Sequence, residues 1–117
     1  MESTERIRGV IFADESVRDA LLALREGKFE EKRLLGWLEE ARAALMADPF
    51  VGVRVERKLW PKIYFKKYEI NNLWKYDLQD GWRLIYTVRG NEVEIMSVIL
   101  EWLSHKQYER RFGYKAR

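Results

Sequence analysis

The amino-acid sequence predicts an α+β domain in which an antiparallel sheet of about four strands carries an N-terminal helical hairpin on one face, followed by a short C-terminal helix. Three observations lead to this expectation. Two segments in the first half repeat apolar residues at helical spacing. Residues 74–88 alternate apolar and polar side chains on both sides of a turn, as a half-buried β-hairpin does. The order strand, two helices, three strands and short helix favours one sheet covered by helices.

The first strand and first helix are predicted from residues 7–27. The segment IRGVIF, residues 7–12, is rich in β-branched and aliphatic residues and is typical of a strand. Asp14 or Ser16 can cap the helix that follows, and Gly27 is a plausible stop. One face of this helix carries a stripe of apolar residues, Val17, Ala20, Leu21 and Leu24.

A second helix is predicted from about residue 28 to residue 46. It ends before Pro49, because the residue that precedes a proline disfavours the helical conformation. Its apolar stripe consists of Leu34, Leu38, Ala41 and Leu45. We expect the two helices to form an antiparallel hairpin that covers one face of the sheet.

The composition indicates a single domain, residues 1–117, without a metal or cofactor. A chain of 117 residues can bury its own core. It has no cysteine and one histidine, His105, which excludes disulfides, thiolate metal sites and multi-histidine metal sites. No apolar run approaches the roughly 20 residues of a membrane span, and the start MESTERIRG is unlike a signal peptide. We therefore expect a cytoplasmic protein that does not associate with membranes.

The charge is distributed unevenly along the chain. The net charge is +3 at pH 7, and charged residues make up 35% of the chain, a share compatible with a thermophile. Residues 1–52 hold 8 basic and 11 acidic residues, whereas residues 53–117 hold 14 basic and 8 acidic ones. A positive surface attracts anions, so we expect any anionic partner to bind the second half.

The most basic segment, residues 54–67, has six basic residues and one acidic residue. Its part PKIYFKKY is compatible with a short helix that has proline in its first turn. Aromatic residues are interleaved with the lysines, a composition that suits RNA because rings stack on bases while lysines meet phosphates. A solvated charged helix is the alternative interpretation. The RNA-binding candidates, including two arginines near the C-terminus, are Lys58, Lys62, Lys66, Lys67, Arg110 and Arg111.

The turn within WKYDLQDGWRLIYTV determines which side chains share a face, because a one-residue slip reverses all of them. A two-residue loop, 80–81, would mix apolar and charged residues on one face. A three-residue loop, 79–81, with its glycine in the left-handed conformation, keeps the faces distinct and places Asp77 opposite Arg83. The second register agrees with both the turn chemistry and the pattern. It puts Lys75, Asp77 and Arg83 on the face away from the aromatic residues.

The next turn, in RGNE, leads to a strand at residues 93–100. A loop at Gly90 and Asn91 would place Tyr86 opposite Ile95 and Arg83 opposite Val98. The second face would then be semi-apolar, which suits a concave binding surface. A cross-strand Asp–Arg pair is common and contributes only ~0.2–1 kcal/mol. The pattern alone therefore leaves both a structural pair and a functional Arg83 open.

A capping box predicts the C-terminal helix. Ser104 is followed three residues later by Gln107, so a helix from about residue 105 to residue 111 is expected. His105 and Tyr108 are three positions apart and hence on one face of that helix. Either side chain can serve as a general acid or base, and the sequence does not assign the two roles.

These features resemble the RelE/ParE superfamily, the toxins of type II toxin–antitoxin systems. The order of elements matches over nearly the whole chain. The segment LWKYDLQDGWRLIYTV is similar to the family's signature of a basic strand, a turn, then glycine, an aromatic residue, arginine and an aliphatic-aromatic run. The segment HKQYERRFGY looks like the family's closing segment.

The resemblance implies a metal-independent endoribonuclease that cleaves mRNA in the ribosomal A site, with a cognate antitoxin protein as inhibitor. It implies that Arg83 contacts the scissile phosphate and that Lys75 is the first basic residue of the preceding strand. Tyr108 matches the closing tyrosine, and His105 resembles the closing histidine of some branches. Asp77 stands where many members have a second basic residue, and Trp102 stands near another arginine position.

Two other functions remain open for a chain of this kind. A ParE-like toxin inhibits a protein target such as DNA gyrase without catalysis. An inactive member of the fold would bind RNA without cleaving it. A gyrase-type inhibitor does not require Lys75, Arg83, His105 and Tyr108 to converge on one surface.

Overall fold

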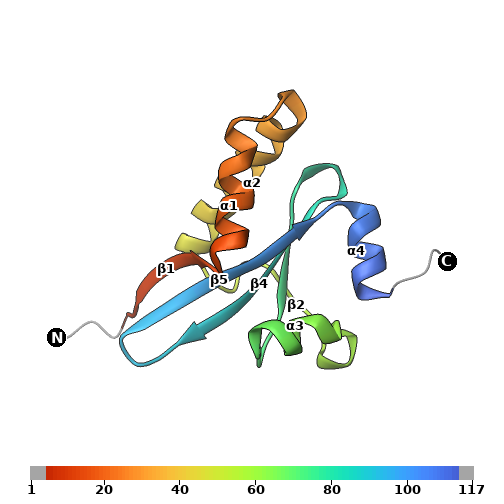
Figure 1. Ribbon diagram of the computed structural model, residues 1–117. Helices are drawn as coiled ribbons and strands as arrows, with labels where there is room; N and C mark the ends of the chain where they lie inside the picture. The colour runs from red at the N-terminus through yellow and green to blue at the C-terminus, as the bar shows by residue number, and fades with distance from the viewer. Residues whose placement is uncertain (1–4, 114–117) are drawn as a thin grey trace.

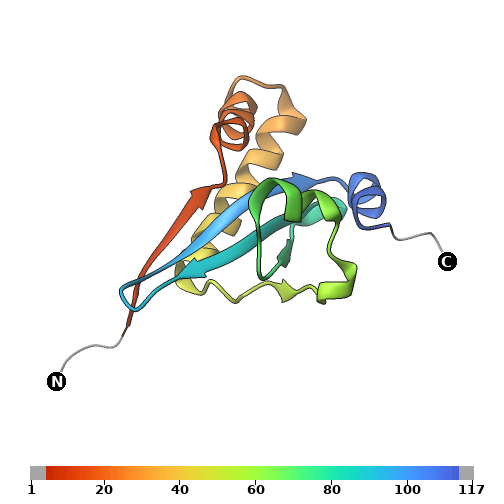
Figure 2. The same cartoon turned by 60° about the horizontal axis from the view of Figure 1, so that its bottom comes forward.

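A mixed β-sheet with helices on both faces organises residues 5–113, the part of the chain that the computed structural model describes (Figures 1 and 2). The fold is α+β, as predicted. Two short 3₁₀ turns, Arg57–Leu59 and Gln79–Gly81, join the longer elements. In chain order these elements are β1 (Ile7–Phe12), α1 (Glu15–Arg25), α2 (Phe29–Ala47), β2 (Val53–Arg54), α3 (Lys62–Tyr68), β3 (Trp74–Asp77), β4 (Arg83–Gly90), β5 (Glu94–Leu103) and α4 (His105–Phe112).

The sheet differs from the predicted antiparallel sheet of about four strands. Within the described residues it has five strands in the order β1-β5-β4-β3-β2. Strands β3, β4 and β5 form the expected antiparallel meander, but β1 runs parallel to β5. The direction of β1 was not predictable because the pattern of one strand does not reveal its partner. Strand β2 was missed because two residues are too few to show alternation.

The helical hairpin α1–α2 covers one face of the sheet, as predicted (Figure 1). Asp14 is the N-cap of α1, since its carboxylate accepts a hydrogen bond from the backbone N–H of Val17 at 3.0 Å. The predicted stripe of α2 is fully packed. Together with residues from α1, β3, β4 and β5 it makes the hairpin core, Val17, Leu21, Leu34, Leu38, Ala41, Leu45, Trp74, Leu84, Tyr86 and Ile99.

The β3–β4 hairpin has the predicted register. Asp77 pairs with Arg83, and the N–H of Leu78 donates to the carbonyl of Trp82 at 2.8 Å. The connection at residues 79–81 places two successive residues, Asp80 at φ 54° and Gly81 at φ 79°, in the left-handed region. This three-residue loop keeps Lys75 and Arg83 on the same face.

The β4–β5 turn lies further along the chain than predicted. Gly90 pairs with Ile95, and the side chain of Asn91 accepts hydrogen bonds from the N–H groups of Val93 and Glu94. The predicted pairing of Tyr86 with Ile95 is therefore wrong, since Tyr86 lies opposite Ile99. The prediction placed Gly90 in the loop, but the Asn91 side chain closes the turn one step later and leaves Gly90 in the strand. The shift is an even number of residues, so each side chain near the turn keeps its predicted face.

A β-bulge in β5 changes the register towards α4. Tyr86 pairs with Ile99 but its neighbour Ile85 pairs with Glu101, which leaves Leu100 as the extra residue. Leu100 and Glu101 consequently point to the same face, towards α3 and α4. Arg83 therefore lies opposite Leu103, whereas the prediction placed it opposite Val98.

The second face of the sheet is a covered core, not the open concave surface that the pattern suggested. Helices α3 and α4 both pack on it (Figure 2). The alternation within the strands predicted which side chains lie on this face. It did not indicate that α3 and α4 cover them. The α3–α4 core consists of Val55, Trp60, Tyr64, Ile70, Leu73, Ile85, Val98, Leu100, Leu103, Tyr108 and Phe112.

None of the helices in residues 5–113 has the length and apolar character of a membrane span.

Candidate active site beside the β3–β4 turn

Three of the predicted site residues converge from three different elements. Lys75 comes from β3, Arg83 from β4 and Tyr108 from α4. The Arg83 guanidinium carbon lies 5.0 Å from the centre of the Tyr108 ring, and Lys75 Nζ lies 5.9 Å from the same centre. Both distances are within the range of a cation–π interaction. The buried tyrosine ring therefore holds two cations side by side at the edge of the α3–α4 core.

Asp77 is the counter-ion that both cations share. Its Oδ1 atom lies 3.2 Å from Lys75 Nζ and 3.0 Å from Arg83 Nε. The lysine and arginine side chains are 22% and 19% exposed, whereas the aspartate is 56% exposed. The cluster thus carries a net charge of +1 and presents its carboxylate, with the two cations behind it, to solvent.

The guanidinium of Arg83 is fixed in orientation. Its Nη1 donates to the carbonyl of Gly81, within the β3–β4 turn, and its Nε faces Asp77. The remaining nitrogen, Nη2, makes no hydrogen bond to residues 5–113. A planar guanidinium held at one side and open at the other is suited to bind a phosphate oxygen.

His105 lies at the rim of this cluster. It is the first residue of α4, and its side chain is 58% exposed, with Nε2 at 3.4 Å from Glu109 Oε2. A β-carbon on Gly81 would be 3.0 Å from the β-carbon of His105, so the glycine allows α4 to approach the turn. His105 therefore adjoins the turn that binds Arg83, while Tyr108, one turn further along α4, points into the core.

The predicted capping box orients α4. The Ser104 side chain accepts from the N–H of Gln107 at 3.3 Å, and the Gln107 side chain accepts from the N–H of Ser104 at 2.9 Å. These bonds satisfy backbone donors at the start of the helix. They fix the helix end that carries His105 and Tyr108. Tyr114, in the closing segment that resembles the family, lies outside the described residues.

Arg33 of α2 is a neighbour of the site that the sequence did not indicate. Its Nη2 lies 3.3 Å from Asp80 Oδ2 in the β3–β4 turn, although the two residues are 47 positions apart. Its guanidinium carbon also lies 5.0 Å from the centre of the Trp37 ring. No local pattern connects α2 with this turn, so only the tertiary structure could reveal the contact.

Five of the six predicted RNA-binding residues are exposed and fall into two groups. Lys62 and Lys66 are exposed on α3, and Arg110 is exposed on α4. Two others have an intramolecular partner but remain exposed: Lys58 lies 3.5 Å from Glu56, and Lys67 lies over the Tyr68 ring. The exposed lysines and Arg110 remain available to an anion.

Arg111 does not belong to an open basic surface, in contrast to the prediction. Its Nε and Nη2 donate to the carboxylate of Glu101 at 3.0 and 3.2 Å. The hydroxyl of Tyr64 donates to the same carboxylate, and burial together with this negative charge raises the pKa of Tyr64. The three residues join α3, β5 and α4. We therefore assign Arg111 a structural role.

Trp102 has a structural explanation as well. It pairs with Leu84 and packs against the hairpin core, on the face of the sheet opposite the cluster. It therefore supplies neither charge nor contact to the site. The position near which some family members have another arginine is thus occupied by a core aromatic residue.

The described residues 5–113 contain no group of three or more acidic or histidine side chains arranged to hold a metal ion. Comparisons of the chain with protein-family models, with curated proteins and with solved structures found no match.

Proposed function

We propose that the protein is the toxin of a type II toxin–antitoxin pair and acts as a metal-independent endoribonuclease on ribosome-bound mRNA in the cytoplasm. The observation that carries the proposal is the convergence of Lys75 and Arg83 over the ring of Tyr108 beside the β3–β4 turn. The resemblance to the RelE/ParE superfamily supports it, because the same three residues match the family's site. The cognate antitoxin protein is the proposed inhibitor.

The proposed reaction uses the 2′-hydroxyl of the RNA as nucleophile. The 2′-oxygen loses its proton to a base and attacks the adjacent phosphorus, and the bond from phosphorus to the 5′-oxygen breaks. The leaving 5′-oxygen takes a proton from an acid. The products are a 2′,3′-cyclic phosphate and a 5′-hydroxyl end. Arg83 stabilises the charge that develops on the phosphate oxygens, and Lys75 adds a second positive charge beside it.

His105 and Tyr108 are the candidates for proton transfer. His105 is exposed at the rim of the cluster and is the more accessible of the two. Tyr108 is buried, and its ring lies beneath both cations. A positioned acid or base contributes roughly 10²–10⁴-fold to the rate. A pH–rate profile of the His105→Ala and Tyr108→Phe variants distinguishes their roles.

The test of the proposed function is cleavage of mRNA on programmed ribosomes by purified Arg83→Ala protein. We expect cleavage to fall by about 10²–10³-fold, the usual effect of removing one fixed donor to a developing oxyanion. Arg25→Ala is the matched control, because Arg25 is an exposed arginine at the end of α1. Circular dichroism checks that both variants are folded. If the Arg83→Ala protein cleaves at the wild-type rate, the proposed role of this cluster is wrong.

A further inference from the structure

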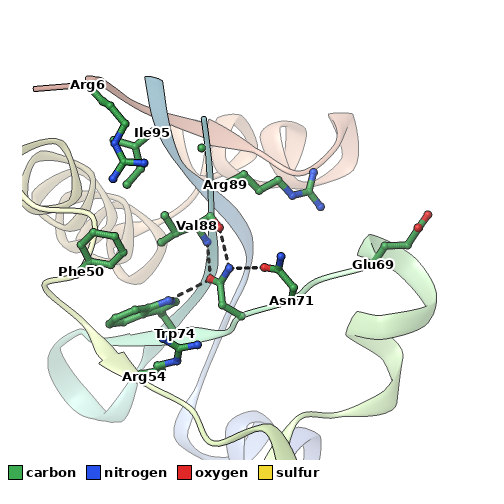
Figure 3. A pocket seen from close by; sticks show the side chains of 11 residues that line it. Arg6, Phe50, Arg54, Glu69, Asn71, Trp74, Val88, Arg89 and Ile95 are labelled. Carbon is green, nitrogen blue, oxygen red and sulfur yellow. Dashed lines mark hydrogen bonds between the residues drawn. The ribbon is translucent and has the colours of Figure 1, made fainter. Parts of the chain in front are cut away.

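A cavity of about 650 Å³ lies at the opposite end of β4 from Arg83 (Figure 3). Arg83 and Arg89 are six residues apart on this strand, which corresponds to about 20 Å. The cavity volume is within the range of about 300–1,000 Å³ typical of small-molecule sites. Its main lining residues, drawn from five segments of the chain, are Arg6, Phe50, Arg54, Asn72, Trp74 and Arg89.

The cavity is lined by three arginines and one acidic residue, Glu69. Within residues 5–113 the Arg6 side chain makes one long hydrogen bond, 3.4 Å from Nη1 to the carbonyl of Asn91. Arg54 lies over the Trp74 ring with its guanidinium carbon 5.9 Å from the ring centre. Neither arginine has an ion-pair partner among residues 5–113. Two cations without counter-ions at one cavity favour an anionic ligand.

Aromatic rings form the apolar part of the cavity. Phe50 is 48% exposed, and its ring centre lies 5.4 Å from that of Trp74. Buried Tyr86 anchors the loop that carries Phe50, because its hydroxyl donates to the carbonyl of Pro49 and accepts from the N–H of Gly52. Burial raises the pKa of Tyr86 to about 12, so the hydroxyl retains the proton that it donates. The Phe50 ring is thus an anchored, accessible surface on which a planar base can stack.

Asn72 decides between a nucleotide and a peptide strand as ligand. Its side-chain amide accepts from the N–H of Val88 and donates to the carbonyl of Val88, both at 2.8 Å. Dashed lines at Val88 mark these two bonds in Figure 3. The amide therefore occupies the place that a neighbouring strand would take beside β4. An added peptide strand depends on free backbone groups at a sheet edge, and those of Val88 are already bonded. The cavity is better suited to a ligand that is recognised by stacking and charge.

We propose that this cavity binds a nucleotide, with its base stacked on the exposed Phe50 ring and its phosphate held by Arg6 and Arg54. A free mononucleotide and a nucleotide within an RNA strand share this chemistry. The inference does not rest on the proposed function. The cavity lies at the other end of β4 from Arg83, and neither Lys75 nor Arg83 lines it.

The test is isothermal titration calorimetry with adenosine monophosphate, inorganic phosphate and a 2′-O-methyl hexanucleotide, which cannot be cleaved by 2′-hydroxyl attack. We expect the mononucleotide to bind more tightly than phosphate. Arg54→Gln should weaken mononucleotide binding by about tenfold, as loss of one charge-assisted hydrogen bond does. Phe50→Ala should weaken mononucleotide binding but not phosphate binding. Arg25→Gln, which removes an equal charge at the end of α1, should change neither.

The outcomes separate the two sources of the nucleotide. Binding of both ligands, each weakened by Arg54→Gln, supports a site for free nucleotides that also accepts RNA. Hexanucleotide binding alone, if Arg54→Gln weakens it, supports a site for an RNA strand. The proposal is overturned if neither the mononucleotide nor the hexanucleotide binds, or if wild type and Arg54→Gln bind them with equal affinity. Binding of an acidic peptide in place of the nucleotides also overturns it. Arg83→Ala should bind mononucleotide normally, so failure here is distinct from failure of the proposed function.

Discussion

Asp77 is the residue that sets the character of the candidate active site. It neutralises one of the two positive charges, of Lys75 and Arg83, that a phosphate would meet. The exposed carboxylate also lies where RNA phosphates would approach the cluster. Its pairing with Arg83 was predictable from the sequence, because the glycine of the β3–β4 turn fixes the register.

Asp77→Asn should strengthen the binding of RNA. Removing the carboxylate raises the local charge, so a single-stranded RNA should bind more tightly at low salt. The slope of log affinity against log salt concentration should become steeper by about 0.7 for each additional phosphate that the protein neutralises. Filter binding at several salt concentrations measures both effects. Asp19→Asn, which removes a carboxylate from an exposed position of α1, is the control. Weaker binding by Asp77→Asn would instead mean that Asp77 chiefly positions Arg83.

Other residue roles depended on tertiary contacts that a linear pattern does not show. Arg111 was predicted to bind RNA, but the bulge at Leu100 turns Glu101 towards it and pairs it internally. Arg33 meets the β3–β4 turn only because α2 packs across the sheet. The residues that converge are those whose register or helical spacing was fixed locally, namely Lys75, Arg83 and Tyr108.

At the scale of elements, features encoded within a few neighbouring residues were predicted correctly, whereas features that depend on distant strands were not. The stripe of α2, the cap of α1 and the capping box of α4 each arise within a few residues, and the structure confirms all three. The direction of β1 and the existence of β2 depend on pairing with distant strands. The basic segment showed no clean period because α3 is only seven residues long.

Helix α3 tests whether the basic segment serves RNA. Tyr64 fixes the helix to the core, while Lys62 and Lys66, one turn apart, are exposed. The double variant Lys62→Ala with Lys66→Ala should weaken ribosome association and make its salt dependence shallower by about 0.7–0.9 for each phosphate that is no longer neutralised. Sedimentation with ribosomes at several salt concentrations measures this. Lys28→Ala with Lys32→Ala, which removes two exposed lysines at the same spacing, is the control. Binding equal to wild type throughout would exclude a role for α3.

The whole molecule has two cores separated by one sheet, with a candidate site at each end of β4. The α3–α4 core supports the cluster around Arg83, and the hairpin core supports the aromatic cavity around Trp74. The sequence predicted the hairpin core, whose face alternates regularly. It did not predict that the second face is also covered, because α3 and α4 are short and lie apart in the chain. The cavity was missed because its lining comes from distant segments.

The most direct test of the central claim is to map mRNA 5′ ends in cells that express the whole protein, with and without the neighbouring gene. We predict growth arrest accompanied by new 5′-hydroxyl ends at a fixed position relative to the ribosomal A site, suppressed when the antitoxin is present. Both effects should be absent with Arg83→Ala. Growth arrest without new mRNA ends, or arrest that Arg83→Ala retains, would contradict the account and would favour a protein target.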